Sequence, residues 1–488
     1  MSLAPRMRDL ERKSTATNAG RSYALLLLAT SLGGILAPLN STMLAVALPA
    51  IRRDFDVGHA EIGWLVSSYL IAMAVAQPLG GRLGDQMGRA RVFRWGLAAF
   101  LALSLATAAA PTFSALILLR TAQAVVGAAV IPNGMAMVRE SAPPDKLGQS
   151  TGVTGAAMSI AAAIGPLLGA GLLSAGSWRW LFVMNAPLVV GALALFALLR
   201  YPEPAARQRM QVDWVGAPVF AALLVSVTFL LNSLRGGQDA LALGGGTISL
   251  LVLGTLFVQR QRSSAAPVAE WQLFRNRSYA AATAYILLAN LVMYTTLLSV
   301  PFFLEEVQER GNATTGLLLG AMSVLMAGLA PFGGLLSDRV GRRLPAMAGG
   351  AIMLAGVALI LGGIDADVSP GYLAACLAVL GVGMGLSFGA ATTAAIESAP
   401  RELAGAAAGT NSMMRYLGSI VGAGILGAVL SSDSGAPDAS LFRLIFAVLA
   451  AMAALAMATT PLIHRRVGAG RLSTDGERLS MDKERISG

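Results

Sequence analysis

Charged residues are scarce in this sequence: aspartate, glutamate, lysine and arginine make up 13% of its 488 residues. A soluble domain carries roughly 25% charged residues, so the composition excludes an ordinary soluble enzyme or a secreted domain. The single cysteine excludes an intramolecular disulfide. The only two histidines, His59 and His464, are far apart. We therefore expect neither an enzyme nor a bound metal or cofactor.

Long apolar runs take the place of the missing charge, since 55% of the residues are hydrophobic. A helix needs about 20 mostly apolar residues to cross a bilayer, and the chain contains fourteen such runs. The expected fold is therefore all-α and membrane-spanning. The predicted spans are residues 23–48, 60–80, 92–110, 112–138, 149–175, 179–199, 213–233, 242–259, 279–304, 313–336, 344–363, 370–396, 403–430 and 440–462.

The basic residues predict an orientation for these spans. With the N-terminus inside, the cytoplasmic segments hold 28 lysines and arginines and the outside loops hold 6. Such a bias places both termini in the cytoplasm, so the net charge of +10 indicates topology, not nucleic-acid binding. We expect a multi-pass protein of the bacterial cytoplasmic membrane, surrounded by lipids.

An internal repeat divides the chain into two related halves. The segment Pro78-Leu-Gly-Gly-Arg-Leu-Gly-Asp85-Gln-Met-Gly88-Arg89 recurs 253 residues later as Pro331-Phe-Gly-Gly-Leu-Leu-Ser-Asp338-Arg-Val-Gly341-Arg342. Two halves of this kind are the plan of many transporters. The expected domains are a tail (1–22), a six-helix bundle (23–200), a linker with two extra spans (201–277), a second six-helix bundle (278–462) and a C-terminal tail (463–488).

Several motifs give the sequence a specific resemblance. GGRLGDQMGRAR at 80–91 resembles motif A of the major facilitator superfamily, Leu118-Leu-Arg120-Thr-Ala-Gln123 resembles motif B, and Gly155 followed by Gly165-Pro166-Leu-Leu-Gly169 resembles motif C of its exporters. The segments 178–187, 213–216 and 273–277 are similar to those of the fourteen-span drug:proton antiporter family. The resemblance covers residues 23–462.

The resemblance implies two six-helix bundles around a central cavity, alternating access, and export of a small-molecule substrate driven by proton entry. It also implies function as a monomer. It implies a conformational role for the motif A residues Gly81, Asp85, Gly88, Arg89, Arg91, Gly334, Asp338, Gly341 and Arg342. It implies a hinge at Gly155, Gly165, Pro166 and Gly169.

The first span departs from this family. Where the family carries an aspartate, the sequence has Leu39-Asn40-Ser41-Thr42, and an amide does not titrate. None of the 26 acids lies deep in a predicted span; the ionisable residues there are Arg120 and Arg415. The candidates for proton coupling are therefore Arg120, which would bias a nearby proton site, and the edge acids Glu305, Glu306 and Glu397. The alternative for these acids is a solvated helix end.

Polar residues within apolar stretches are candidates to line the substrate cavity, because a buried polar group in a membrane is costly. The alternative for the neutral residues is hydrogen bonding between helices. For Arg120 it is a structural role, bonded to backbone carbonyls and Gln123, and for Arg415 it is a side chain that extends toward the cytoplasm. The candidates are Asn40, Thr42, Arg120, Gln123, Asn133, Asn290, Tyr294 and Arg415.

The leading hypothesis is an exporter of amphipathic or apolar small molecules, a drug or a metabolite, which uses alternating access and proton antiport. Two arginines without a midplane acid favour neutral or anionic substrates over cations. The alternatives are an uncoupled facilitator or a transporter of lipids or anionic metabolites with the same fold, and a membrane receptor that binds without transport.

Overall fold

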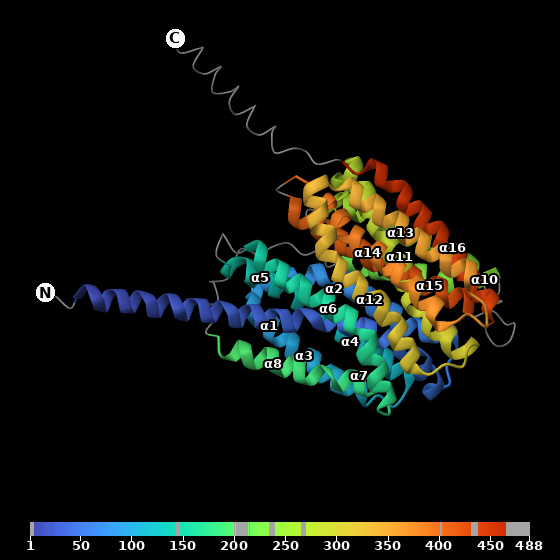
Figure 1. The fold of residues 1–488 in the computed structure, drawn as a ribbon, viewed down its shortest axis with the longest axis horizontal. Helices are drawn as coiled ribbons and strands as arrows, with labels where there is room; N and C mark the ends of the chain where they lie inside the picture. The colour runs from blue at the N-terminus through green and yellow to red at the C-terminus, as the bar shows by residue number, and fades with distance from the viewer. Residues whose placement is uncertain are drawn as a thin grey trace, which may run out of the picture.

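The computed structural model describes residues 4–142, 147–199, 201, 213, 215–233, 240–264, 270–400, 403–430 and 438–464. Within these ranges the chain is helical and contains no strand. Figure 1 shows two groups of helices, α1–α8 and α11–α16, which diverge toward the end from which the N-terminus projects. The predicted C-terminal tail lies outside the described residues from residue 465 on.

The first group comprises α1 (Ala4–Phe55), α2 (His59–Met87), α3 (Arg89–Ala108), α4 (Phe113–Gly127), α5 (Val130–Ser141), α6 (Leu147–Ser174), α7 (Trp180–Val183) and α8 (Asn185–Ala197). Two helices follow, α9 (Gly216–Ser233) and α10 (Ala240–Ser263). The second group comprises α11 (Arg277–Phe302), α12 (Asn312–Val340), α13 (Arg343–Gly363), α14 (Pro370–Glu397), α15 (Ala404–Leu430) and α16 (Ala439–Thr459), with a π-helical turn at Phe303–Val307.

Among the described residues, thirteen helical segments are long and apolar enough to cross a membrane. They coincide with thirteen of the predicted spans. The other predicted span, 213–233, forms the shorter apolar helix Gly216–Leu231 within α9. The all-helical membrane fold is thus confirmed, while the count of fourteen spans stays a prediction. The helix α1 begins at Ala4, so much of the segment expected as a tail is helical.

Two predicted spans are each built from two helices because proline interrupts them. Pro132 has no amide hydrogen to donate to the carbonyl of Ala128, and the chain turns between α4 and α5 at Ala128–Ala129. Likewise, Pro187 cannot donate to the carbonyl of Val183, and α7 ends there. Each pair of helices nevertheless continues as one apolar span.

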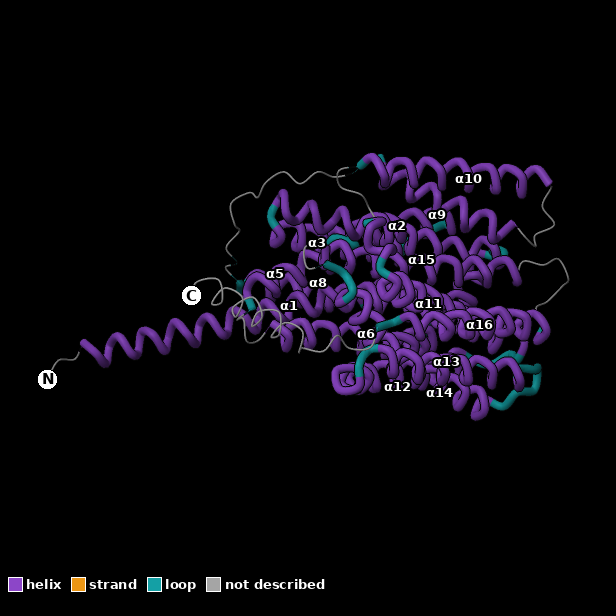
Figure 2. The backbone as a smooth tube through the Cα atoms, turned by 90° about the horizontal axis from the view of Figure 1, so that it is seen from above, coloured by secondary structure: helices purple, strands orange, loops and turns teal. Residues whose placement is uncertain are grey.

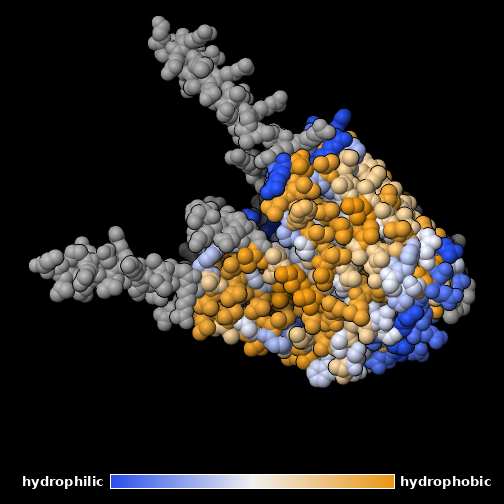
Figure 3. Space-filling model, viewed as in Figure 1, coloured by the Kyte–Doolittle hydropathy of each residue, from blue (hydrophilic) through white to orange (hydrophobic). Residues whose placement is uncertain are grey.

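We call the end of the molecule that carries Asp85 and Asp338 the inner end, and the end that carries His59 and Glu306 the outer end. Figure 3 shows a broad apolar surface between the polar groups at the two ends. Lipid tails would contact such a surface, because a soluble protein does not expose apolar patches of this size. Leucine and isoleucine side chains are also exposed along α10, for example Ile248 and Leu251.

The internal repeat is visible in the helix packing. Within the halves, α1 packs against α6 and its counterpart α11 packs against α15. Between the halves, α6 packs against α12 and α15 packs against α2. The helices α9 and α10 stand at one edge, where α9 contacts α2 and α15 (Figure 2).

An ion pair joins the two edge helices at the inner end. The Asp213 carboxylate, which precedes α9, accepts hydrogen bonds from Arg260 Nε on α10 at 2.9 Å and from the Gly216 amide at 2.8 Å. Burial alone would raise the pKa of Asp213. Hydrogen bonds from Arg260, the Gly216 amide and Ser264, together with the charge of Arg260, outweigh burial and lower the pKa below its usual value. The carboxylate therefore stays ionised and holds the start of α9 to the end of α10.

The two halves touch at the outer end. In α12 the buried residues cluster between Thr315 and Ser323, whereas Val324, Phe332 and Leu335 nearer the inner end are exposed. In α6, Ala170 and Leu173 near the outer end are buried, and further in Val153 and Ile160 are about half exposed. The outer end is therefore closed in this conformation, and the contact between the halves loosens toward the inner end.

Substitution of Gly381 by valine is expected to destabilise the second half. A Cβ at Gly381 would overlap the backbone carbonyl of Met322, where α14 crosses α12, and a carbonyl cannot move aside as a side chain can. Overpacking of this kind costs about 1–3 kcal/mol. The melting temperature in detergent should fall by several degrees. The matched control is Gly371→Val in the same helix, where a Cβ meets nothing within 4 Å; an equal loss in both variants would contradict the packing argument.

Candidate functional site

Asn40 lies inside the first half and hydrogen-bonds to other neutral groups. Its Nδ2 donates to Asn185 Oδ1 on α8 at 2.6 Å and to the Leu36 carbonyl at 3.2 Å. Asn185 in turn donates to Ser104 Oγ on α3 at 2.7 Å. The position that carries an acid in the resembled family is thus part of an uncharged network between α1, α3 and α8. Sequence reasoning missed Asn185, whose only signal is an amide within an apolar run.

Arg120 is the large charged residue buried at the centre of the molecule, with 1% of its surface exposed. Its guanidinium lies over the Tyr69 ring of α2 at 4.3 Å and near the Phe182 ring of α7 at 5.4 Å. It donates to Gln123 Oε1 one turn along α4 at 3.2 Å. The structure thus brings the predicted Arg120 and Gln123 together and adds two aromatic rings, which attract the cation.

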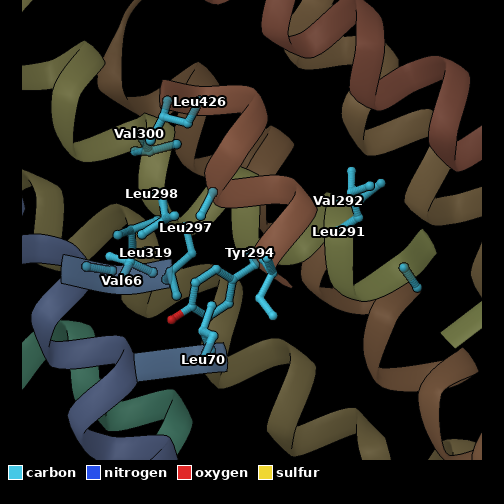
Figure 4. Packing of buried hydrophobic residues seen from close by; sticks show 14 of the residues in the cluster. Val66, Leu70, Leu291, Val292, Tyr294, Leu297, Leu298, Val300, Leu319 and Leu426 are labelled. Atoms are coloured by element: carbon cyan, nitrogen blue, oxygen red, sulfur yellow. The ribbon is translucent and has the colours of Figure 1, made fainter. Parts of the chain in front are cut away.

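Ser41 and Tyr294 connect the two halves next to this arginine. Their hydroxyl oxygens are 2.5 Å apart, and their positions differ by 253 residues, the spacing of the internal repeat. Equivalent residues of two related halves meet where the symmetry axis passes between them. Figure 4 shows Tyr294 projecting from α11 beside Leu70 of α2. Tyr294 also lies within electrostatic range of Arg120.

The glycines of the predicted hinge allow α6 to approach α1 closely. A Cβ at Gly165 would overlap Thr42 Oγ1, and a Cβ at Gly169 would lie 2.8 Å from the Met43 carbonyl oxygen. Thr42 itself donates to the Pro38 carbonyl at 3.0 Å, so this cavity candidate lies in a helix crossing. Gly155, nearer the inner end, has no neighbour within 4 Å of a Cβ position.

The same part of α6 also contacts the second half. The Pro166 carbonyl and Ala170 face Gly316 of α12, and Leu167 faces Gly320. The second half repeats the crossing within itself, since a Cβ at Gly418 would overlap the Leu287 carbonyl and one at Gly422 would lie 2.5 Å from Thr295 Oγ1. These α15 glycines are counterparts of Gly165 and Gly169, which the 253-residue spacing could have identified.

Asn133 takes part in packing between α2 and α5. Its Nδ2 donates to the carbonyls of Ala129 at 2.7 Å and Gly80 at 2.9 Å. A Cβ at Gly84 would overlap its Oδ1, and a Cβ at Gly80 would lie 2.5 Å from the Ala129 Cα. Two glycines of the first repeated motif therefore let α2 lie directly against the α4–α5 segment.

The repeated inner-end motif forms the same ion-pair arrangement in both halves. Gly88 and Gly341 end their helices with φ values of 97° and 89°, a region that favours glycine. The next arginine then turns back to the aspartate: Arg89 bonds Asp85 at 2.7 Å and Arg342 bonds Asp338 at 2.5 Å. A glutamate from the second span after the motif completes each set at the inner end.

That glutamate is Glu140 in the first half, 3.0 Å from Arg89, and Glu397 in the second, 2.6 Å from Arg342. Hydrogen bonds to Glu397 and Asp338 raise the pKa of Arg342 above its already high value. The coupling candidate Glu397 is therefore one member of an inner-end ion pair. Of the other motif residues, Gly81 lies near Pro132, Arg91 is exposed at the start of α3, and Gly334 has open space around its Cβ position.

Two further candidates lie apart from the arginine. Asn290 is buried and its Nδ2 donates to the Ile286 carbonyl of its own helix at 3.1 Å. Arg415 is exposed on α15, next to Tyr416. The structure thus brings Arg120, Gln123 and Tyr294 near one another, whereas Asn40, Thr42, Asn133 and Asn290 bond to neighbouring helices or to their own backbone.

At the outer end, ion pairs cross between the halves. Arg52 bonds Glu306 at 2.6 Å, Arg53 bonds Glu305 at 2.9 Å, and His59 Nε2 lies 2.9 Å from Glu306 Oε2. The basic partners come from α1 and α2 and the acids from the π-helical turn after α11. Only 9% of the Glu306 side chain is exposed. Sequence reasoning identified both acids but not their partners.

Comparison with known proteins identifies the family. The model of the Major Facilitator Superfamily matches residues 30–423 and 313–479. The chain is 31% identical to an uncharacterized MFS-type transporter, YvkA of Bacillus subtilis, over 88% of this chain and 94% of that protein. It is 33% identical to the multidrug resistance protein Stp of Mycobacterium tuberculosis, over 84% of this chain and 76% of that protein.

A solved structure shares the fold. A D-xylose–proton symporter superposes with a TM-score of 0.66 at 13% identity, covering 89% of this chain and 96% of that one. At this identity the likeness speaks for the helical architecture and not for the substrate. The repeated inner-end motif, the related halves and the family match agree, and the chain belongs to the Major Facilitator Superfamily of membrane transporters.

Proposed function

We propose that the protein exports amphipathic or apolar small molecules across the bacterial cytoplasmic membrane by alternating access, with proton antiport. The observation that carries the proposal is the one-sided contact between the halves. Ion pairs and close glycine contacts hold the outer end together, whereas the inner ends of α6 and α12 are exposed. With the basic segments in the cytoplasm, this is an inward-facing state that would accept substrate from inside. The name of the relative Stp, a multidrug resistance protein, supports export of drugs.

For proton coupling we propose Glu306 as a site where external protons act. Its carboxylate pairs with Arg52 of α1 and His59 of α2, and these contacts hold both helices to the second half. A proton on Glu306 would remove its negative charge and weaken both contacts, which favours opening toward the outside. Substrate release and proton entry would then occur from the same open state.

An uncoupled facilitator is the second candidate. It is favoured by the buried centre, where the described residues place Asn40, Asn185 and Arg120 but no carboxylate. Proton release into weakly buffered detergent solution on addition of substrate distinguishes the two: antiport requires release, and an uncoupled carrier gives none. Vesicle uptake of ethidium and of an anionic dye with an imposed proton gradient tests transport itself. Strong proton-driven transport of ethidium would contradict the preference for neutral or anionic substrates.

Substitution of Asn40 by aspartate is expected to create or steepen the pH dependence of transport. A carboxyl group there would sit beside the neutral Asn185 and Ser104, and burial favours its protonated form. It would therefore titrate closer to neutral pH than a free aspartate and add a charge to the network when it ionises. Transport by the wild type and by Asn40→Asp is compared from pH 5.5 to 8.5. Identical profiles would locate the pH response at the outer acids instead.

A further inference from the structure

Arg120 is a buried cation for which the described residues supply no acid. The charged or titratable groups within its electrostatic range are the phenols Tyr69 and Tyr294, and its hydrogen-bond partner is the neutral Gln123. A buried guanidinium without a counter-ion is costly, because attraction to aromatic rings replaces only part of its hydration. The site therefore favours the arrival of an anion.

Three hydrogen-bond donors at this place have no partner. Arg120 Nε, Gln123 Nε2 and Tyr69 Oη are all buried and make no hydrogen bond. A buried donor that makes no hydrogen bond costs about 1–3 kcal/mol of free energy. Gln123 uses its carbonyl oxygen to accept from Arg120, so the group left over is its amide NH₂. A guanidinium, an amide NH₂ and a phenol together present donors, which is the chemistry that binds a carboxylate.

The surroundings suit a molecule with an apolar body. The Phe182 ring lies near the Arg120 guanidinium, and Tyr294 and Tyr416 lie within electrostatic range of Tyr69. Leu70 of α2 lies beside Tyr294 (Figure 4). Arg120 and Gln123 belong to α4 and Tyr69 to α2 of the first half. Tyr294 of α11, which contacts Ser41 of α1 across the halves, lies within electrostatic range of Arg120. A ligand here would therefore touch both halves, as a transported molecule must.

We propose that Arg120, Gln123 and Tyr69 bind the head group of a singly charged organic anion, a carboxylate on an aromatic or aliphatic body. This rests on the proposed transport function and names its substrate class. One guanidinium neutralises one negative charge, so a monocarboxylate leaves the site neutral, whereas a cationic drug would add a second positive charge to a buried cation. The site therefore selects amphipathic acids against amphipathic amines.

The test uses three fluorescent probes with one body: anthracene-9-carboxylate, 9-anthracenemethanol and 9-(aminomethyl)anthracene. Binding to the purified full-length protein in lipid nanodiscs is measured at pH 7.5, with empty nanodiscs as the blank. The carboxylate is expected to bind at least tenfold more tightly than the alcohol, and the amine more weakly than the alcohol. Equal affinities, or tighter binding of the amine, would overturn the proposal.

Variants locate the preference. Arg120→Gln is expected to weaken carboxylate binding at least tenfold and to leave alcohol binding within about twofold. Tyr69→Phe removes one donor but keeps the ring and should weaken carboxylate binding three- to tenfold; if Arg120→Gln does not fold, this variant and the wild-type series decide. The matched control is Arg139→Gln, an exposed arginine on α5, which should change nothing. If the preference for the carboxylate over the alcohol is as large in Tyr69→Phe and Arg120→Gln as in the wild type, the site is contradicted.

The experiments can contradict the anion site and the transport function independently of each other. If vesicles transport the ethidium or anionic dye of the functional assay but the nanodiscs show no carboxylate preference, the anion site is wrong and the transport function stands. If the preference is present and depends on Arg120, but neither dye nor the anthracene acid is transported, the site stands and the transport function is wrong.

Discussion

Substitution of Gly316 by leucine is expected to abolish transport while the protein still folds. A Cβ at Gly316 would overlap the Cβ of Ala170 and lie 3.1 Å from the Pro166 carbonyl oxygen, so a leucine does not fit while α6 and α12 are in contact. Overpacking costs about 1–3 kcal/mol for added methylenes, and the conformations of a transporter differ by only a few kcal/mol. The variant should therefore be held with its outer end open, and transport should fall more than tenfold.

Thiol labelling checks this conformation directly, because the natural Cys376 is buried. A cysteine replaces Gly63, which lies at the outer seam between the halves beside Leu298 and Leu426. With a membrane-impermeant maleimide, this cysteine should react several-fold faster in the Gly316→Leu protein. The control is Gly328→Leu in the same helix, where a Cβ meets nothing within 4 Å. Normal transport by Gly316→Leu would mean that this contact does not have to close.

Substitution of Glu306 by glutamine is expected to weaken closure of the outer end and to lower transport about tenfold. Glutamine keeps the shape and one acceptor oxygen but removes the charge that faces Arg52 and His59. Because Glu306 is 9% exposed and Arg52 25% exposed, the loss is larger than for a surface pair and smaller than for a fully buried one, about 1–2 kcal/mol. A shift of about 1.4 kcal/mol changes the ratio of closed to open molecules tenfold.

The same outer cysteine and a pH series test the second variant. Labelling should be faster in Glu306→Gln than in the wild type. Because a maleimide reacts with the thiolate, whose fraction falls as the pH is lowered, the two proteins are compared at each pH. The ratio of variant to wild-type rates should fall toward one at low external pH, since only the wild type has the carboxylate that accepts the proton. The control is Glu309→Gln, which makes the same change three residues further along the chain. A variant whose labelling and transport keep the wild-type pH response would show that Glu306 is not the site of proton action.

Much of the architecture could be predicted from the sequence because it depends on the length of apolar runs and on a repeated motif. Span length follows from the bilayer thickness, and the apolar runs are long enough to exceed it. The recurrence of Asp85 and Gly88 as Asp338 and Gly341 predicted equivalent structures at the inner end, and both glycines indeed adopt positive φ values before an arginine that turns back to the aspartate.

The candidate site was less predictable, because residue type does not determine which helix a side chain faces. Asn40 and Arg120 are both polar residues in apolar runs, yet Asn40 bonds to Asn185 within its own half and Arg120 Nε has no hydrogen-bond partner. The choice depends on helix rotation, which is fixed by distant contacts such as Gly165 against Thr42. The partners of Glu306 were hidden for the same reason, since they lie about 250 residues away along the chain.

The outer ion pairs bear on how such a chain arose. With the 253-residue spacing of the repeat, position 305 is the counterpart of 52 and position 306 the counterpart of 53. The pairs Arg52–Glu306 and Arg53–Glu305 therefore occupy equivalent places, each joining position 52 or its counterpart to position 53 or its counterpart. In an assembly of two identical half-length chains, equivalent residues carry the same side chain. Arginines would then face arginines and repel. With arginine at both 52 and 53, the ion pairs at this end therefore depend on divergence of the two halves, which placed glutamate at 305 and 306.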